Sequence, residues 1–201
     1  MLPMTSIVDV EGTPVEVENG KRENARAWYL LSDEDPADAS LSQSGIPMTY
    51  IGLDTSLAIL ENELQHEDGN VAVLGFSQGG VFAHILSVLA MRDKCAFRRI
   101  QCVIIASGFC ACHVSHENSP YQVGDLMTTK VSLPSLHLIG EKDTSVNPKL
   151  SLQLASMFEG SDILLHDKGH LLPQKSAQCA TLISFLERNH KRKSGHMVTS
   201  S

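Results

Sequence analysis

The chain has 201 residues, of which 42% are hydrophobic and 19% are charged, a composition typical of one globular domain with a sizeable core. Its formal net charge is −7 and no basic stripe crosses its body, which argues against nucleic-acid binding. No apolar run is long enough to span a bilayer, and the start lacks the pattern of a signal peptide. We predict one domain over residues 1–190 and a flexible basic and polar tail over residues 191–201.

In chain order, residues 6–10 predict a short strand, and residues 11–50 predict a long, turn-rich, acidic surface excursion with some order around the Trp-Tyr pair at its centre. Apolar residues at helical spacing then predict a helix over residues 50–65. The apolar run at residues 71–76 predicts a buried strand, and residues 79–91 predict a helix directly after it.

The second half of the chain continues the alternation. Residues 100–107 form an apolar, β-branched run that predicts a strand buried on both faces, and residues 133–140 predict another. A helix with proline in its first turn is predicted over 148–158, a strand over 162–166 and a last helix over 174–189. Alternating strands and helices predict an α/β fold, with a mainly parallel sheet covered by helices on both faces.

The stretch LGFSQGG places a serine between two glycines where a strand gives way to a helix. So tight a reversal forces unusual backbone angles on Ser77, and the small neighbours Gly75 and Gly79 avoid clashes. The hydroxyl then projects above the carboxyl edge of the sheet, an arrangement called a nucleophile elbow. The new helix aims its N-terminal N–H groups at the same point, and the backbone N–H of Gln78 is the expected first oxyanion donor.

A serine hydroxyl is a weak nucleophile without a base, so an acid and a histidine are expected later in the chain. Asp143 and His170 each come just after a predicted strand, and so belong to the same sheet edge as Ser77. Two rival carboxylates lie in the same loops. Glu141 is closer to its strand and more consistent with a structural role, and Asp167 is expected to face solvent.

The histidine must be chosen from nine in the chain. His84 lies within the helix after the elbow and His137 within a strand, and both are expected to be packed or hydrogen-bonded in the core. His166 is the main rival of His170, but its place at the end of a strand should make it less mobile. The predicted general base is therefore His170.

Five cysteines at irregular spacing favour free thiols over a disulfide framework, and hence a cytoplasmic, or also nuclear, location. Cys110, Cys112, His113 and His116 gather in CACHVSH, and such side chains can bind zinc. Their spacing matches none of the usual zinc patterns. We therefore expect a loop that lines the active site, and no metal.

Taken together, these motifs resemble the FSH family of serine hydrolases. The resemblance rests on ARAWYL at 26–31, LGFSQGG at 74–80, ASGFC at 106–110, LPSLHLIGEKDTSVNP at 133–148 and HDKGHLLP at 166–173. It implies an α/β-hydrolase fold and the hydrolysis of carboxylic esters with alkyl or acyl chains, with no cofactor. It also implies Ser77 as nucleophile, Asp143 as the orienting acid and His170 as the general base.

The start of the chain departs from the family's pattern. The family opens with a strand that ends in a motif like Leu-His-Gly-Phe, whereas SIVDVEGTPVEV, from residue 6 on, resembles the family's second strand. The opening loop carries the second oxyanion N–H in this fold, and its strand lies beside the elbow strand. We therefore expect either an N-terminally truncated form, or a shift of residues 6–10 to pair with the elbow strand.

The sequence thus predicts a serine esterase that acts on small esters, with an aliphatic group accommodated near the motifs. Loss of one oxyanion donor would slow acyl transfer by about 10²–10³-fold. One alternative is an acyl-protein thioesterase or lysophospholipase, for which GFSQGG is also typical. Another is a non-catalytic, truncated hydrolase that acts as a binding or regulatory form.

Overall fold

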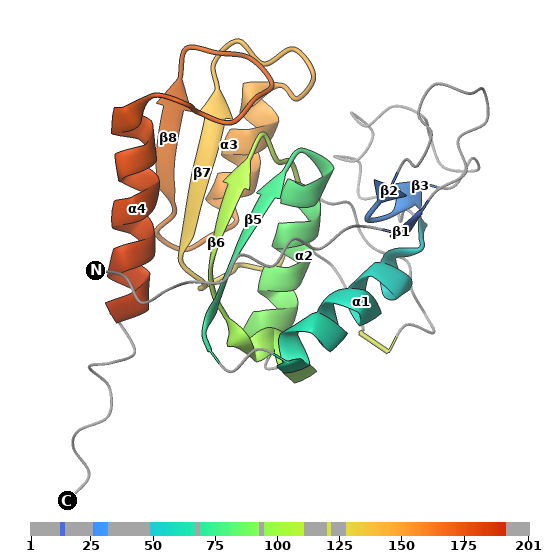
Figure 1. The fold of residues 1–201 in the computed structure, drawn as a ribbon. Helices are drawn as coiled ribbons and strands as arrows, with labels where there is room; N and C mark the ends of the chain where they lie inside the picture. Colours follow the sequence, from blue (N-terminus) through green and yellow to red (C-terminus); the bar gives the residue numbers. More distant parts are fainter. Residues whose placement is uncertain are drawn as a thin grey trace, which may run out of the picture.

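The computed structural model describes residues 13–14, 26–31, 49–66, 69–92, 95–110, 120–121 and 128–191. The main sheet of this part is parallel and has the strand order β5-β6-β7-β8 (Figure 1). Its strands are β5 (Val71–Phe76), β6 (Ile100–Ala106), β7 (Ser135–Gly140) and β8 (Asp162–His166). Because all four strands run in the same direction, their carboxyl ends meet at one edge of the sheet.

Helices cover both faces of this sheet, as predicted. The helices are α1 (Leu53–His66), α2 (Gln78–Met91), α3 (Pro148–Ser156) and α4 (Ser176–Lys191), and a 3₁₀ helix, η2, spans Cys95–Arg99. Alternate side chains of β6 pack against the helices on opposite faces of the sheet. Ile105 packs into the cluster that holds α2, whereas Ile104 packs with Phe185 of α4 on the other face.

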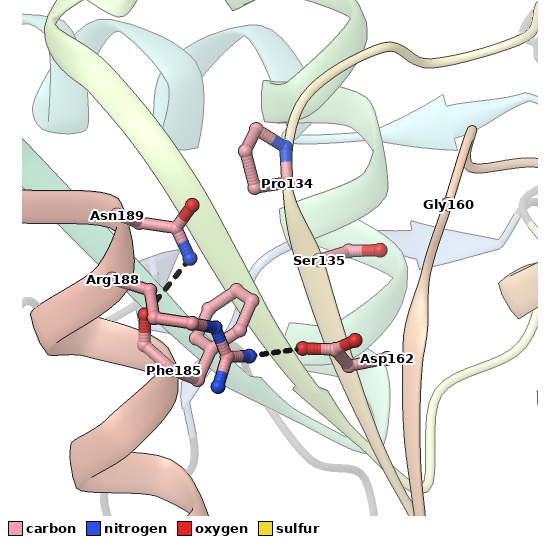
Figure 2. Close-up of a pocket in the computed structure, with 7 residues that line it drawn as sticks. All are labelled: Pro134, Ser135, Gly160, Asp162, Phe185, Arg188 and Asn189. Atoms are coloured by element: carbon pink, nitrogen blue, oxygen red, sulfur yellow. Dashed lines mark hydrogen bonds and ion pairs between the residues drawn. The ribbon is translucent and has the colours of Figure 1, made fainter. Parts of the chain in front are cut away.

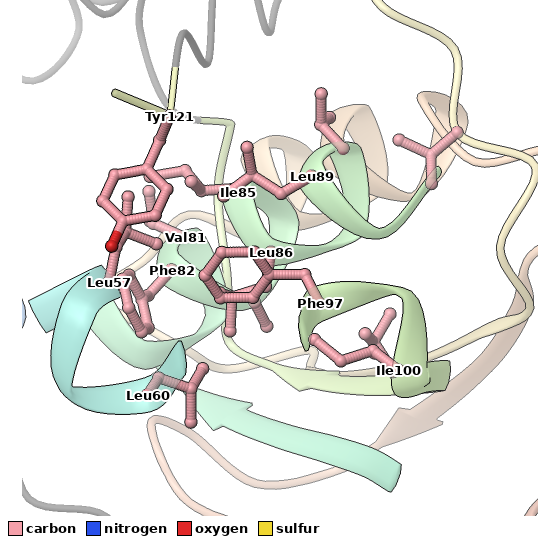
Figure 3. Close-up of a cluster of buried hydrophobic side chains, with 14 of the residues drawn as sticks. Leu57, Leu60, Val81, Phe82, Ile85, Leu86, Leu89, Phe97, Ile100 and Tyr121 are labelled. Atoms are coloured by element: carbon pink, nitrogen blue, oxygen red, sulfur yellow. The ribbon is translucent and has the colours of Figure 1, made fainter. Parts of the chain in front are cut away.

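The larger core cluster lies between α1, α2 and η2 (Figure 3). Helix α2 is buried all round between Gly80 and Leu89, because the sheet covers one side and α1 and η2 cover the other. Phe97 of η2 is fully buried there, and its ring meets that of Tyr121 edge-on at 5.8 Å between centroids. The helix that follows Ser77 is therefore firmly held.

Strand β5 is less buried than its apolar sequence predicts. Among the described strands it has a partner only in β6, and it lies at the edge of the sheet. Its alternate residues face away from α2, and Leu74 on that side is 50% exposed. The prediction of a buried strand at residues 71–76 is therefore wrong in burial, although its bounds are right.

Short antiparallel pairs precede the main sheet. Strand β1 (Thr13–Pro14) pairs with β2 (Arg26–Ala27), and β3 (Leu30–Leu31) pairs with β4 (Tyr50–Ile51). Residues 50–51 were expected to begin a helix, and this prediction is wrong. Gly52 has a φ of +80°, so the chain turns out of β4 there before α1 begins at the next residue.

The other predicted elements are found within two residues of their expected bounds. Pro148 occupies the first turn of α3, and the Asn147 side chain caps that helix by accepting the Lys149 N–H at 3.0 Å. The predicted strand at residues 6–10 lies outside the described residues, and so does most of the excursion at 11–50. The predicted tail also lies outside them, except that Lys191 ends α4.

Candidate active site

Ser77 stands between β5 and α2 in the conformation expected for a nucleophile elbow. Its φ is +54° and its ψ is −115°, which is a strained conformation for a residue with a side chain. Its N–H donates to the Ala106 carbonyl at 2.9 Å, and its own carbonyl accepts the Gly80 N–H at 2.9 Å. Serine at this position commonly caps a helix, but here the side chain makes no capping bond. The Ser77 hydroxyl is therefore not engaged in capping α2.

Close backbone packing explains the glycines around the elbow. A Cβ on Gly75 would overlap the Gly79 carbonyl, so glycine is required there, as predicted. A Cβ on Gly79 would only touch the indole nitrogen of Trp28 at an ordinary 3.4 Å. The second steric requirement lies one residue further on, because a Cβ on Gly80 would approach the Cα of Gly108 to 2.9 Å.

Asp143 lies in the loop after β7, with its side chain 2% exposed. Its Oδ1 accepts the N–H groups of Ser145 and Val146, both at 2.9 Å, and its Oδ2 faces His170. Burial alone would raise the pKa of this carboxyl. The hydrogen bonds from the Val146 N–H, from His170 and from the Ser145 N–H, with the nearby Ser107 hydroxyl, outweigh burial and hold the pKa below its usual value. Asp143 is thus a fixed carboxylate at neutral pH.

His170 lies in the loop after β8 and meets Asp143 directly. Its Nδ1 donates to the Asp143 Oδ2 at 2.9 Å, a bond that leaves Nε2 as the free acceptor of the neutral ring. The ring is 25% exposed, and it packs against Phe76, the residue before Ser77, with 4.7 Å between centroids. No hydrogen bond joins His170 to the Ser77 hydroxyl in the described part of the chain. Such bonds are often long before substrate binds.

Backbone contacts tie the two loops together. The Glu141 N–H donates to the His166 carbonyl at 2.9 Å, and the Lys142 N–H donates to the Lys168 carbonyl at 3.1 Å. A Cβ on Gly140 would overlap the carbonyl oxygen of Gly169, so only glycine allows this approach. The loops that carry Asp143 and His170 are therefore positioned by each other.

The rival carboxylates do not reach His170. Asp167 is exposed, as predicted, and its Oδ1 accepts a hydrogen bond from Lys175 Nζ at 3.1 Å. This lysine lowers the pKa of the Asp167 carboxyl. The side chain of Glu141 is also exposed.

The rival histidines are buried away from solvent. His137 contacts the Ser135 hydroxyl through Nε2 at 3.1 Å, whereas the ring nitrogens of His84 and His166 have no hydrogen-bond partner among the described residues. The expectation that His84 and His137 are core residues is met in packing. Within the described part of the chain, His137 has a hydrogen bond to its ring and His84 has none.

The sequence family described as serine hydrolase (FSH1) matches residues 2–182. The chain belongs to this family. Human esterase OVCA2 is 29% identical over 166 residues, which cover 83% of this chain and 69% of the human protein. An esterase of Aedes aegypti is 31% identical over 160 residues, which cover 80% of this chain and 54% of that protein.

Among solved structures, acyl-protein thioesterase 2 of Zea mays is similar to this chain. It superposes with a TM-score of 0.53 at 20% identity, over 81% of this chain and 72% of that chain. The shared arrangement is the α/β-hydrolase fold, with a parallel sheet between helices. The predicted fold class and family are thus confirmed.

Other features of this serine hydrolase give no competing site in the described residues. A hollow of about 500 Å³ lies at the amino ends of β7 and β8, the edge opposite Asp143 and His170, and it is lined by Ser135, Asp162 and Arg188 among others (Figure 2). No cluster of metal-binding side chains is found among the described residues, and Cys110 is the one member of CACHVSH that they include. No described helix is long and apolar enough to cross a membrane.

Two contacts of the site were not foreseen from the sequence. Ser107, directly after β6, has a φ of +48° and a buried hydroxyl with no hydrogen bond of ordinary geometry to the described residues, close to Asp143. The side chain of Gln78 binds the backbone at Trp28 and Tyr29, about fifty residues earlier. Positive φ at Ser107 has no sequence signal beyond the glycine that follows it.

Proposed function

We propose that this serine hydrolase cleaves carboxylic esters with Ser77 as nucleophile, His170 as general base and Asp143 as the acid that orients the histidine. The observation that supports this proposal most is the hydrogen bond of 2.9 Å between His170 Nδ1 and Asp143 Oδ2. The same His170 ring packs against Phe76, directly before the strained turn at Ser77. The carboxylate is held ionised, as this role requires.

In the proposed reaction, His170 Nε2 accepts the hydroxyl proton while Ser77 Oγ attacks the ester carbonyl. The imidazolium that forms is stabilised by Asp143 and returns the proton to the leaving alcohol. A water molecule, activated in the same way, then releases the acid from the acyl-enzyme. The Asp143 carboxylate stays ionised throughout, because backbone N–H groups hold its other oxygen.

The tetrahedral oxyanion would lie against the N–H of Gln78, the first residue of α2. This N–H belongs to the first turn of the helix, where backbone donors have no partner within the helix and the dipole favours negative charge.

The substrate class is proposed to be an oxoester, because the relatives are named esterases. An aliphatic group in this ester is proposed because apolar residues lie near the motifs. A thioester is the second candidate, and the maize neighbour is a thioesterase by name. Oxoesters and acyl-thioesters of matched chain length separate the two candidates by their ratio of kcat/KM. We propose a reducing compartment, cytoplasmic or nuclear, and the free thiols of Cys102 and Cys179 support this location.

The test is intact-mass detection of labelling by a fluorophosphonate, which phosphonylates an activated serine with loss of fluoride. Wild type should gain one adduct and Ser77→Ala none. Ser156→Ala should label like wild type, because that hydroxyl is exposed and donates to the Gln153 carbonyl at the end of α3. Labelling of Ser77→Ala would refute the assignment. A folded wild type, checked by circular dichroism, that takes no label would favour the non-catalytic alternative.

A further inference from the structure

The segment at residues 26–31 is bound to the first turn of α2 by the side chain of Gln78. The Trp28 N–H donates to Gln78 Oε1 at 3.1 Å, and Gln78 Nε2 donates to the Tyr29 carbonyl at 2.9 Å. One amide thus satisfies a backbone donor and a backbone acceptor at once. The residue that follows Ser77 therefore has two roles, because its backbone N–H is the proposed oxyanion donor and its side chain holds this segment.

The two aromatic residues of the segment are used differently. Tyr29 is buried in the core and meets Tyr50 of β4 edge-on at 4.6 Å between ring centroids. Trp28 lies outside the core proper, half-buried, with its indole stacked on Phe82 of α2 at 4.6 Å and an angle of 11°. Tyr29 thus anchors the segment, whereas Trp28 lies flat along the first turn of the helix.

The indole of Trp28 reaches the elbow itself. Its Nε1 lies 3.4 Å from the position that a Cβ on Gly79 would occupy, so the ring covers the glycine two residues after Ser77. The indole N–H has no hydrogen bond to the described residues. A half-buried aromatic ring with an unused donor is a surface suited to a ligand that has both an apolar body and a polar group.

We propose that Trp28 is a specificity-determining residue, forming the wall that the apolar group of the ester packs against beside Ser77, and that Gln78 positions it. This inference rests on the proposed esterase function. Glycine at position 79 leaves room for the indole. The two hydrogen bonds of the Gln78 amide restrict the motion of the segment at residues 26–31, whose strands are only two residues long. The expected substrate is an ester whose chain is long enough to reach the indole.

The first test uses the fact that Trp28 is the single tryptophan of the chain, so the intrinsic emission reports on it alone. The protein is labelled with methyl and with octyl fluorophosphonates, and the mass confirms one adduct on Ser77. The octyl adduct should shift the emission to shorter wavelength and reduce quenching by acrylamide, and the methyl adduct should not. Equal emission and quenching for the two adducts would overturn the inference and leave the proposed function intact. Absence of any adduct would overturn both.

The second test measures kcat/KM for butyrate and octanoate esters of the same alcohol. In Trp28→Ala the octanoate-to-butyrate ratio should fall about tenfold or more, in the range that a few methylene contacts supply. Gln78→Ala, which keeps the backbone N–H, should show the same loss in weaker form. Gln101→Ala is the matched control, since that half-buried side chain also donates to backbone carbonyls, of Arg98 at 3.1 Å and of Arg99 at 3.3 Å.

An unchanged ratio in folded Trp28→Ala would overturn the inference. Trp28→Phe guards against a folding defect, because phenylalanine can still stack on Phe82 while it lacks the second ring and the N–H. Its ratio should lie between those of wild type and Trp28→Ala. If the octanoate-to-butyrate ratio across the Trp28 variants varied with their thermal stability and not with the size of the ring, the segment would have a merely structural role.

Discussion

Replacing His84 with leucine should remove part of the acid sensitivity of the fold. His84 is fully buried in α2, and its ring packs against Phe158 at 5.7 Å between centroids. Neither ring nitrogen has a hydrogen-bond partner in the part of the chain that the structure describes. Burial lowers the pKa of His84 from 6.5 to about 4. The lowered pKa means that the folded chain keeps this histidine neutral where the unfolded chain would protonate it.

The sign and size of the effect follow from proton linkage. Between pH 6.5 and about 4 the unfolded state binds the extra proton, so the free energy of unfolding falls as the pH falls. At pH 5 this amounts to about 2 kcal/mol for His84, relative to pH 7.5. Burial, and then His84 itself, lower the pKa of His137 to about 3, so His137 adds about 2 kcal/mol in the same direction.

The assay is urea unfolding, followed by circular dichroism at pH 7.5 and at pH 5. The loss of unfolding free energy between these two pH values should be about 2 kcal/mol smaller in His84→Leu than in wild type. At pH 7.5 the variant should be as stable or more stable, because it removes a buried polar ring that has no hydrogen bond to the described residues. His66→Gln replaces an exposed histidine and serves as the control. A loss in His84→Leu equal to that of wild type would show that His84 is not a neutral, buried group.

Three further predictions concern the site and the surface. Gly75→Ala should cost more than about 3 kcal/mol of unfolding free energy, because its Cβ would overlap the Gly79 carbonyl, whereas Gly79→Ala should change it by less than about 1 kcal/mol; urea unfolding compares the two. Asp143→Asn should lower kcat/KM for a short ester by on the order of 10³–10⁴, since it removes the charge beside His170, and a loss below tenfold would exclude the triad. Arg188→Ala should cost at most about 1 kcal/mol in thermal unfolding, because its ion pair with Asp162 is exposed to solvent.

Much of the sheet could be predicted from the sequence because its strands are continuous apolar runs. Strand β6 is buried along nearly its whole length, and β5 and β8 begin and end at the predicted residues. Runs of this kind arise when a parallel strand lies between two layers of helices. The exposure of Leu74 could not be predicted in the same way, since burial depends on which elements lie next to the strand.

The N-terminal part was harder to predict for a local reason. The helical spacing that predicts α1 extends back through residues 50–51, but these residues pair with Leu30 and Leu31, twenty residues earlier. Sequence periodicity contains no information on that pairing. The single local sign was Gly52, whose positive φ separates the strand from the helix.

The shared sheet edge of Ser77, Asp143 and His170 could be predicted because each follows a strand of a parallel sheet, and the structure brings the last two into contact. Their supporting contacts were not predictable, since they join distant parts of the chain. The Gln78 amide reaches Trp28 and Tyr29 across about fifty residues. A glutamine in a turn has many possible partners, and only the folded chain selects this one.

The carboxyl edge of the sheet is stiff because its loops meet backbone to backbone. The turn after β5 packs Gly75 on the carbonyl of Gly79, and the loops after β7 and β8 meet at Gly140. The first turn of α2 touches the loop after β6 where Gly80 faces Gly108. A side chain at any of these contacts would separate the backbones by the width of a methyl group, and misplacement of a reacting group by about 1 Å can cost 10²-fold in rate. Small residues away from the candidate catalytic side chains thus control the geometry on which the proposed reaction depends.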